Sequence, residues 1–228
     1  MKNIILPLLI LTTVTIGCKT TQSQKKTNLN KTEKAAIIGS SSGAVLGGIL
    51  GNKKNNSVLG AILGATVGGA VGVVIGNKMD KQAKKIQDEL GNVAKVERVG
   101  EGIKLTFDSQ LLFDFGKASL RESYKDDLWK LGNTLKQYPE TDLLIVGHTD
   151  NVGSESFNEA LSKKRAKTVS DELTSTGISK NRIKVKGKGE TQPSETNETD
   201  LGRSQNRRVE IAIYANKKMK AAAIKENL

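Results

Sequence analysis

The sequence predicts an α+β protein, a two-layer sandwich in which helices pack on one face of a sheet. Three observations in the second half of the chain predict this class. Short segments with apolar residues at every second position indicate strands, longer segments with apolar residues three and four apart indicate helices, and the two kinds alternate across short connections. A domain over residues 103–216 therefore has the element order β-α-β-α-β-β, with one further strand in front of it.

The first helix of this domain follows two predicted strands. The stretches "VAKVERVG" (93–100) and "GIKLTFDSQLLF" (102–113) indicate strands, and in the second of them Ile103 and Leu105 occupy alternate positions. The apolar residues of the helix then recur every three or four positions: Leu120, Tyr124, Leu128, Leu131 and Leu135. Pro139 ends this helix, because proline disfavours helical backbone in the residue before it.

The remaining elements are a buried strand, a second helix and two strands. "DLLIVG" (142–147) is a continuous apolar run, which is typical of a strand buried on both faces. The second helix is predicted from about Ser156 to Ser175, just before a glycine. "RIKVKG" (182–187) and "RRVEIAIY" (207–214) alternate between polar and apolar residues and indicate strands, and residues 217–228 are expected to form a peripheral tail.

The positive charge of the chain lies outside the predicted domain. The 228 residues have a formal net charge of +12. Residues 1–102 hold 14 Lys and Arg against 6 Asp and Glu, whereas residues 103–214 hold 18 against 17. A nucleic-acid-binding protein concentrates basic charge on its folded module. This distribution therefore argues against nucleic acid as a partner and favours basic flanks beside an anionic lipid surface.

The chain begins with a pattern that is typical of a secretory signal. "MKNIILPLLILTTVTIGC" has a lysine near its start, then a short uncharged apolar stretch, and Gly17 before Cys18. This end resembles a bacterial lipobox, with Thr15 in place of the usual leucine. The resemblance implies that residues 1–17 are removed and that Cys18 is acylated by chains such as palmitate, which anchor a protein in a membrane. The alternative is a buried cysteine in an uncleaved anchor.

Two apolar segments within residues 35–76 carry glycine at every fourth position. After a polar tether (18–34), these segments contain Gly39, Gly43, Gly47, Gly51, Gly60, Gly64, Gly68, Gly72 and Gly76. Glycines four apart form a ridge that lets two helices approach closely, so the pair is predicted as a helical hairpin. Its composition resembles the glycine-zipper segments of some outer-membrane lipoproteins. Residues 57–76 are uncharged and long enough to span a bilayer. A hairpin packed on itself or on copies of itself, a two-span hairpin and a pore remain open, and residues 77–102 form a charged helical linker and the first strand.

Three stretches of the domain combine glycine with charged and apolar residues: "LLFDFGKASL" (111–120), "GHTDNVGSESFNEALSKKRA" (147–166) and "GRSQNRRVEI" (202–211). Asp150 follows the buried strand, and Arg165 lies within the apolar stripe of the second helix. A guanidinium in that stripe needs a carboxylate or several acceptors. Two interpretations remain open: an internal Arg165–Asp150 salt bridge, or a site in which Arg165 binds the carboxylate and Asp150 the ammonium of one zwitterion.

These motifs resemble the C-terminal domain of the OmpA family over about residues 105–214. The resemblance implies a non-covalent binder of the peptide stem of peptidoglycan, centred on diaminopimelate, which carries an amine and a carboxylate at its far end. It also implies a set of ligand-binding residues: Asp150, Arg165, Thr149, Asn151, Asn158, Leu161 and Arg207. Phe157 stands where the family often has tyrosine, which removes a hydroxyl and keeps the ring.

The sequence offers little support for catalysis. His148 is the only histidine, which excludes a metal cluster built on histidines, and we expect it to be a structural residue of its turn. No serine or aspartate has a spacing that supports a catalytic triad. We therefore expect no enzyme activity, no cofactor and no bound metal.

Together these features predict a lipoprotein of the outer membrane with its wall-binding domain in the periplasm. The expected function is to tether the membrane to peptidoglycan, with homo-oligomers through the glycine ridges as a further expectation. An inner-membrane stator or secretion-associated wall anchor, a wall hydrolase and a pore-former are the alternatives. A proton-conducting stator needs an ionisable group within a span, and residues 57–76 contain none.

Overall fold

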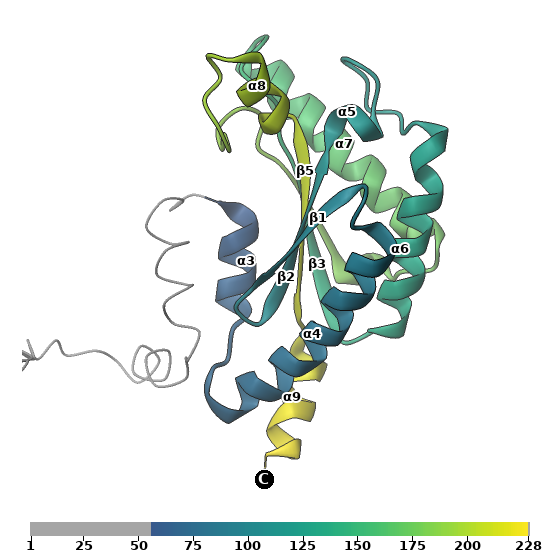
Figure 1. Ribbon diagram of the computed structural model, residues 1–228, viewed down its shortest axis with the longest axis vertical. Coiled ribbons are helices and arrows are strands. Elements are labelled where there is room, and N and C mark those ends of the chain that lie inside the picture. The colour runs from purple at the N-terminus through teal and green to yellow at the C-terminus, as the bar shows by residue number, and fades with distance from the viewer. Residues whose placement is uncertain (1–55, 228) are drawn as a thin grey trace, which may run out of the picture.

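The computed structural model describes residues 56–227 of the chain (Figure 1). Its helices and strands are, in order, α3 (Ser57–Ala65), α4 (Gly69–Leu90), β1 (Ala94–Val99), β2 (Gly102–Asp108), α5 (Ser109–Leu112), η1 (Glu122–Tyr124), α6 (Lys125–Gln137), β3 (Thr141–Gly147), α7 (Glu155–Ser175), η2 (Lys180–Arg182), β4 (Ile183–Gly187), α8 (Asp200–Asn206), β5 (Arg208–Ala215) and α9 (Lys217–Glu226). The predicted α+β class is confirmed. The predicted signal, Cys18, the tether and the first glycine segment lie outside the described residues.

The five strands form one sheet in the order β1-β2-β5-β3-β4. All neighbours are antiparallel except β3 and β4, which are parallel because α7 returns the chain between them. Leu143 and Ile145 of β3 face one side of the sheet, whereas Leu144 and Val146 face the other, and all four are buried. Burial on both faces explains the continuous apolar run that the sequence shows here.

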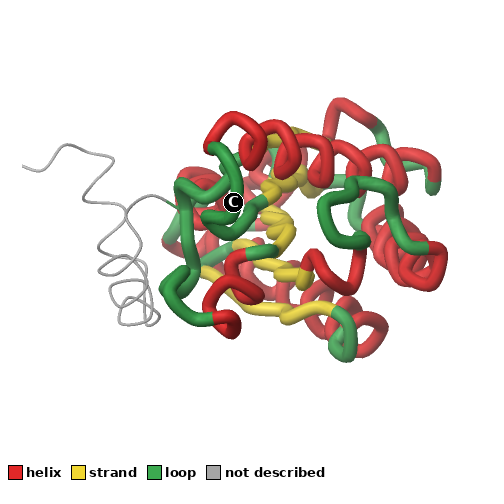
Figure 2. Tube along the Cα trace, turned by 90° about the horizontal axis from the view of Figure 1, so that it is seen from above, coloured by secondary structure: helices red, strands yellow, loops and turns green. Residues whose placement is uncertain are grey.

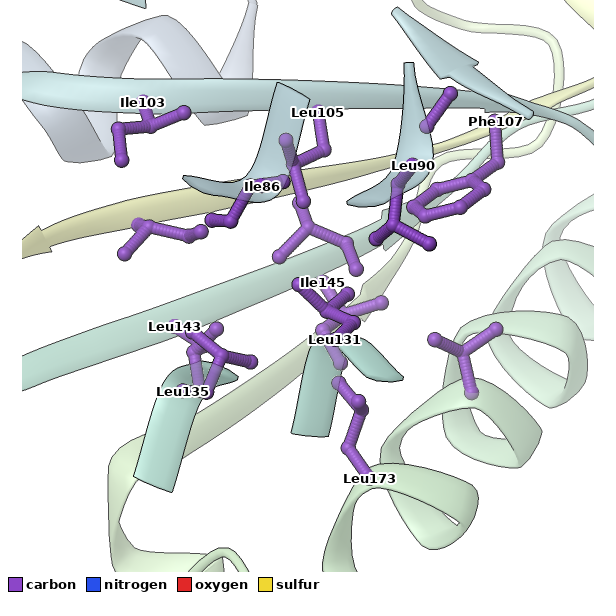
Figure 3. Close-up of a cluster of buried hydrophobic side chains, with 14 of the residues drawn as sticks. Ile86, Leu90, Ile103, Leu105, Phe107, Leu131, Leu135, Leu143, Ile145 and Leu173 are labelled. Carbon is purple, nitrogen blue, oxygen red and sulfur yellow. The ribbon is translucent and has the colours of Figure 1, made fainter. Parts of the chain in front are cut away.

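Figure 2 shows the strands in the middle of the molecule, with helices on either side. The main core lies between the sheet and helices α4, α6 and α7. Figure 3 shows side chains of these helices gathered against the strands: Ile86 and Leu90 of α4, Leu131 and Leu135 of α6, and Leu173 of α7. The stripe of α6 has the spacing that predicted it. The C-terminal tail forms α9, which buries Met219 and Ala223 in the same core.

Helix α3 covers the opposite face of the sheet, which the two-layer prediction left bare. Its apolar residues Val58, Leu59 and Ile62 are buried in a second cluster. The strands contribute the other members of that cluster: Val99, Leu144, Val146 and Ala212. The sheet is therefore sandwiched between helices in this part of the molecule, and part of the second glycine segment supplies one of the layers (Figure 1).

The second glycine segment is divided between two helices. Gly68 and Gly69 have φ angles of 75° and 63°, in the left-handed region that favours glycine. The carboxylate of Glu101 accepts hydrogen bonds from Val67 N at 2.9 Å and Gly68 N at 2.7 Å, which satisfies the backbone at this break. A continuous helix over 57–76, which a membrane span would require, is not formed. No helix within residues 56–227 combines the length and hydropathy needed to cross a membrane.

The glycines on either side of the break have different surroundings. Gly60 and Gly64 are exposed and line an open groove beside β3 and β4, and a Cβ at either would meet nothing within 4 Å. Gly72 is buried, and a Cβ there would lie 2.3 Å from a carboxylate oxygen of Glu101. Gly76 again has open space where a Cβ would be. Helix packing through the glycine ridge stays a prediction.

Two other glycines let α7 approach the sheet closely. At the end of β3, a Cβ on Gly147 would lie 2.1 Å from the carbonyl oxygen of Ser162 in α7. At the end of β4, a Cβ on Gly187 would lie 2.7 Å from the backbone nitrogen of Lys163. The helix that carries Arg165 is thereby held against the end of the strand that leads into Asp150.

A buried ionic network lies beneath the turn that carries Asp150. Arg208 Nε donates to Glu210 Oε1 at 3.0 Å, and His148 Nε2 lies 3.6 Å from Glu210 Oε2, beyond hydrogen-bond distance. Burial lowers the pKa of His148, the carboxylate of Glu210 raises it by less, and Arg208 lowers it further. Burial by itself would raise the pKa of Glu210, but His148 and Arg208 together hold that pKa well below its ordinary range.

Gly147→Ala is expected to lower the free energy of unfolding by at least about 2 kcal/mol, because its neighbour is backbone that cannot rotate away. The same change at Gly60, on the exposed side of α3, is expected to raise that free energy by up to about 1 kcal/mol, since alanine favours helix over glycine. Urea denaturation of both variants measures the difference. Equal effects would contradict the close approach of α7, and a loss at Gly60 would contradict the open space beside it.

Acidification is expected to destabilise the fold in two steps. Above about pH 6.5, His148 is neutral in the folded and unfolded states alike. As the pH falls further, the unfolded chain binds a proton that buried His148 resists, so the free energy of unfolding declines by up to about 1.4 kcal/mol per pH unit. Below about pH 4.5, the unfolded chain also protonates Glu210, whose folded pKa is lowered, and a second loss follows.

Thermal denaturation of the wild type and of His148→Gln between pH 8 and pH 4 tests this assignment. Glutamine does not titrate, so the variant is expected to lose the first step and to keep the second. A first step of full size in the variant would show that another group causes it.

Candidate functional site

A pocket of about 200 Å³ lies at the end of the sheet where β2 and β3 finish and β5 begins. Figure 1 shows α5 and α8 at this same end. The residues that line the pocket come from α5, the loop after it, α7 and the start of β5, and they include Ser109, Gln110, Phe113, Phe115, Arg165 and Arg207. The sequence separates these residues by almost one hundred positions, and the sheet brings them to one edge.

Asp150 is held beside this pocket in the turn after β3. It is 7% exposed, and its Oδ1 accepts from the backbone nitrogen of Val152 at 3.2 Å. Its other oxygen forms an ion pair with Nη1 of Arg207. Asn158 of α7 fixes the turn from the other side, because its amide nitrogen donates to the carbonyl of Asp150 at 3.3 Å and to the carboxylate of Glu190 at 2.6 Å.

Arg165 lies on the inner side of α7, as its place in the apolar stripe predicts, and is 4% exposed. Its Nε donates to the carbonyl of Lys117 at 2.9 Å, and its guanidinium lies 5.3 Å from the centre of the Phe113 ring. Burial lowers the pKa of Arg165, the charge of Asp150 raises it by less, and Arg207 lowers it again.

The internal Arg165–Asp150 salt bridge that the spacing suggested is not formed. Among residues 56–227, Asp150 has Arg207 as its ion-pair partner, and Arg165 has no carboxylate at ion-pair distance. The physical reason is that Arg207 directly precedes β5 and reaches Asp150 across the sheet edge, while Arg165 is drawn to the loop after α5. Arg165 therefore faces the pocket as a buried cation whose nearest polar contact is a carbonyl.

The remaining predicted residues are more spread out. Thr149 is 3% exposed, its backbone nitrogen donates to the carbonyl of Gly189 at 2.9 Å, and its hydroxyl has no hydrogen-bond partner within residues 56–227. Asn151 is exposed in the turn, and Leu161 is partly buried on α7. The structure thus brings Asp150, Asn158 and Arg207 into direct contact, and sets Arg165 in the adjoining pocket wall. Neither Asn151 nor Leu161 lines this pocket.

Individual residues of the α5 loop were missed at the sequence level. Phe113 stacks on Arg165, the carbonyl of Lys117 accepts from it, and the exposed Phe115 stands at the rim of the pocket. The Gln110 amide, in the orientation that satisfies both groups, accepts from Arg207 Nε at 3.3 Å. The stretch "LLFDFGKASL" marked the loop, but backbone carbonyls and aromatic faces leave no charge pattern that would single out its members.

The arrangement suits a small ligand that carries both a carboxylate and an ammonium group. Three guanidinium groups line the pocket. That of Arg121 pairs with Asp114 of the same lining, so those of Arg165 and Arg207 provide donors for a carboxylate, which only accepts hydrogen bonds. Asp150 lies next to them and can accept from an ammonium once Arg207 moves aside. Within the described part of the chain, no group of His, Asp and Glu residues is placed to hold a metal ion.

Comparison with known proteins agrees with the resemblance in the sequence. The model of the OmpA family matches residues 112–207, and that of the YMGG-like Gly-zipper matches residues 1–80. The probable lipoprotein YiaD of Escherichia coli (strain K12) is 35% identical over 60% of this chain and 64% of its own length. The outer-membrane lipoprotein YfiB of Pseudomonas aeruginosa is 34% identical over 50% of this chain and 68% of its own length.

The chain spans less than two thirds of some of these relatives, for example 35% of outer membrane porin F of Pseudomonas fluorescens, which is 37% identical. Two solved structures share the fold. A putative MotB-like protein from Desulfovibrio vulgaris has a TM-score of 0.57 at 23% identity, covering 62% of this chain and 94% of its own. The cell wall anchor of the T6SS from Pseudomonas aeruginosa has a TM-score of 0.54 at 29% identity, covering 59% and 97%.

The lipoproteins and porin among these relatives agree with the prediction that the chain is not an enzyme. The matched segment contains the charged residues that line the pocket, from Asp114 to Arg207, and begins just after Ser109 and Gln110. From its sheet, its site and these matches, the chain belongs to the OmpA family, with a glycine-zipper segment at its N-terminus.

Proposed function

We propose that this protein binds peptidoglycan non-covalently through the peptide stem and tethers the outer membrane to the cell wall. Its ligand group would be the far end of diaminopimelate, and its membrane anchor would be acylated Cys18. The family, the named lipoprotein relatives and the charges of the pocket support this proposal.

Buried Arg165 is the observation that carries the proposal. A guanidinium that is 4% exposed and has no carboxylate partner among residues 56–227 is costly to the fold, because burying an unpaired charge is unfavourable by several kcal/mol. A protein that only needed a packed helix would have an apolar residue at this position of the stripe. A ligand carboxylate bound to the outer nitrogens of Arg165 would supply the missing charge.

The ion pair between Asp150 and Arg207 gives the second half of the site. In the structure, Arg207 neutralises the carboxylate to which this proposal assigns the ammonium. On binding, the ammonium replaces Arg207 at Asp150, and Arg207 keeps its contact with the Gln110 amide while Nη1 becomes free for the ligand carboxylate. Asn158 keeps the turn in place meanwhile, since its contacts are to the backbone of Asp150 and to Glu190.

An inner-membrane or secretion-associated wall anchor is the second candidate. The 29% identity to the cell wall anchor of the T6SS favours it, because that protein anchors a different machine to the wall. Both candidates use the same pocket and differ only in where the N-terminus is held. Separation of inner and outer membranes by density, followed by immunoblotting of the native chain, distinguishes them. Recovery in the inner membrane would overturn the outer-membrane tether and leave wall binding standing.

Asp150→Ala and Arg165→Ala are each expected to weaken binding to intact sacculi that contain diaminopimelate by at least about 30-fold, since truncating one partner of a buried charge pair costs 2–5 kcal/mol. Co-sedimentation of the purified chain with sacculi measures this. Thermal denaturation of the same samples shows whether each variant stays folded.

Lys164→Ala is the matched control for the charge of Arg165. Lys164 is the preceding residue of α7, carries the same charge and is exposed, so its removal is expected to change binding less than twofold. Full binding by folded Asp150→Ala and Arg165→Ala variants, or an equal loss with Lys164→Ala, would contradict the assigned site.

A further inference from the structure

We propose that Ser109 is a ligand-binding residue of this pocket and donates a hydrogen bond from its hydroxyl to the same carboxylate that Arg165 binds. This inference rests on the proposed function, which places a carboxylate at Arg165. It adds α5 to α7 and the start of β5, which carry Arg165 and Arg207. It also predicts that Ser109 helps the pocket to distinguish stem residues that have a far carboxylate from those that lack one.

The Ser109 side chain is buried without a partner. It is 2% exposed, and its Oγ has no hydrogen-bond partner within residues 56–227. Leaving a buried hydroxyl unsatisfied costs about 1–3 kcal/mol, so such a group is uncommon unless something outside the chain satisfies it. Alanine would fit the same space at less cost.

The backbone fixes Ser109 at the pocket rather than elsewhere. Its nitrogen donates to the carbonyl of Arg207 at 2.9 Å, which continues the pairing of β2 with β5 by one residue. Its carbonyl accepts from the nitrogen of Phe113 at 2.9 Å, and the Phe113 ring in turn lies against the guanidinium of Arg165. Ser109, Arg165 and Arg207 therefore line one cavity from three different elements.

The chemistry of the cavity selects the ligand group. Arg165 and Arg207 offer only donors, and a serine hydroxyl can donate to an acceptor that carries charge. The two other charged residues of the lining, Asp114 and Arg121, pair with each other at 2.9 Å. A carboxylate accepts from all three groups at once, whereas an ammonium would be repelled by both arginines. Ser109 is thus expected to act on the carboxylate end of the zwitterion and to be silent toward the ammonium end at Asp150.

A cycle of two variants and two ligands tests this assignment. One ligand is a soluble stem tetrapeptide with diaminopimelate, and the other is the same peptide with lysine, which lacks only the far carboxylate. Isothermal titration calorimetry of the purified full-length chain measures both affinities for the wild type and for Ser109→Ala. The variant is expected to bind the diaminopimelate peptide about 10- to 100-fold more weakly, and the lysine peptide within twofold of the wild type.

Thr106→Val is the matched control. Thr106 of β2 also has a buried hydroxyl without a partner in the described range, but it lies outside the pocket, so valine there should leave both affinities unchanged. Thermal denaturation adds a second measurement, because loss of a structural residue would lower Tm. Removing an unsatisfied hydroxyl is expected to leave Tm unchanged or to raise it in Ser109→Ala, while binding falls.

The possible outcomes distinguish a ligand-binding Ser109 from a structural Ser109 and from failure of the proposed function. Equal losses for the two peptides, or none for the diaminopimelate peptide, would overturn the assignment of Ser109 while wild-type binding upholds the proposed function. A lower Tm with unchanged affinities would make Ser109 a structural residue. If the wild type binds neither peptide, the proposed function fails, and this inference fails with it.

Discussion

The burial of one guanidinium within the apolar stripe of α7 constrains the end of the molecule where the candidate site lies. Arg165 occupies a position where helix packing asks for an apolar side chain, so the surroundings must provide acceptors and an aromatic face in place of water. The α5 loop does this with the carbonyl of Lys117 and the ring of Phe113. The loop in turn depends on the pairing of β2 with β5, which extends to Ser109.

The same constraint explains why α7 lies so close to the sheet. Arg165 can enter the pocket only if the helix reaches the ends of β3 and β4, and both strands end in glycine where the helix backbone passes. Side chains at Gly147 and Gly187 would push α7 outward and take Arg165 out of reach of the loop. Beneath the turn, the network of His148, Arg208 and Glu210 fills the space that remains with polar groups.

Much of the domain fold was predictable from the sequence, because the main helices and strands have the apolar pattern that their buried faces require. The exceptions are α5, which lies at the end of a stretch predicted as strand (102–113), and α8, which was not predicted. The spacing of apolar residues in α6 reflects burial of one helix face, and the uninterrupted apolar residues of β3 reflect burial of both strand faces. The site was predictable only in part. Asp150 and Arg165 are visible as charges in apolar surroundings, but which arginine pairs with Asp150 depends on how strands far apart in sequence meet.

The second glycine segment shows a different limit. Apolar periodicity records that a helix face is covered and not what covers it, so residues 57–65 had the pattern of a membrane helix although they lie on a sheet face. The break at Gly68 and Gly69 depends on backbone angles and on Glu101, a residue about thirty positions away. No local pattern contains that contact.

The charges of the site also explain why a zwitterion fits better than a simple cation or anion. Asp150 and Arg207 neutralise each other, and Arg165 is left as the one buried cation of the pocket without a carboxylate partner in the described chain. A lone ammonium would free Arg207 from Asp150 and leave two arginines unpaired. A lone carboxylate would pair with Arg165 and leave Asp150 as it was. Only a group with both a positive and a negative charge can exchange with the internal ion pair and compensate Arg165 in the same step.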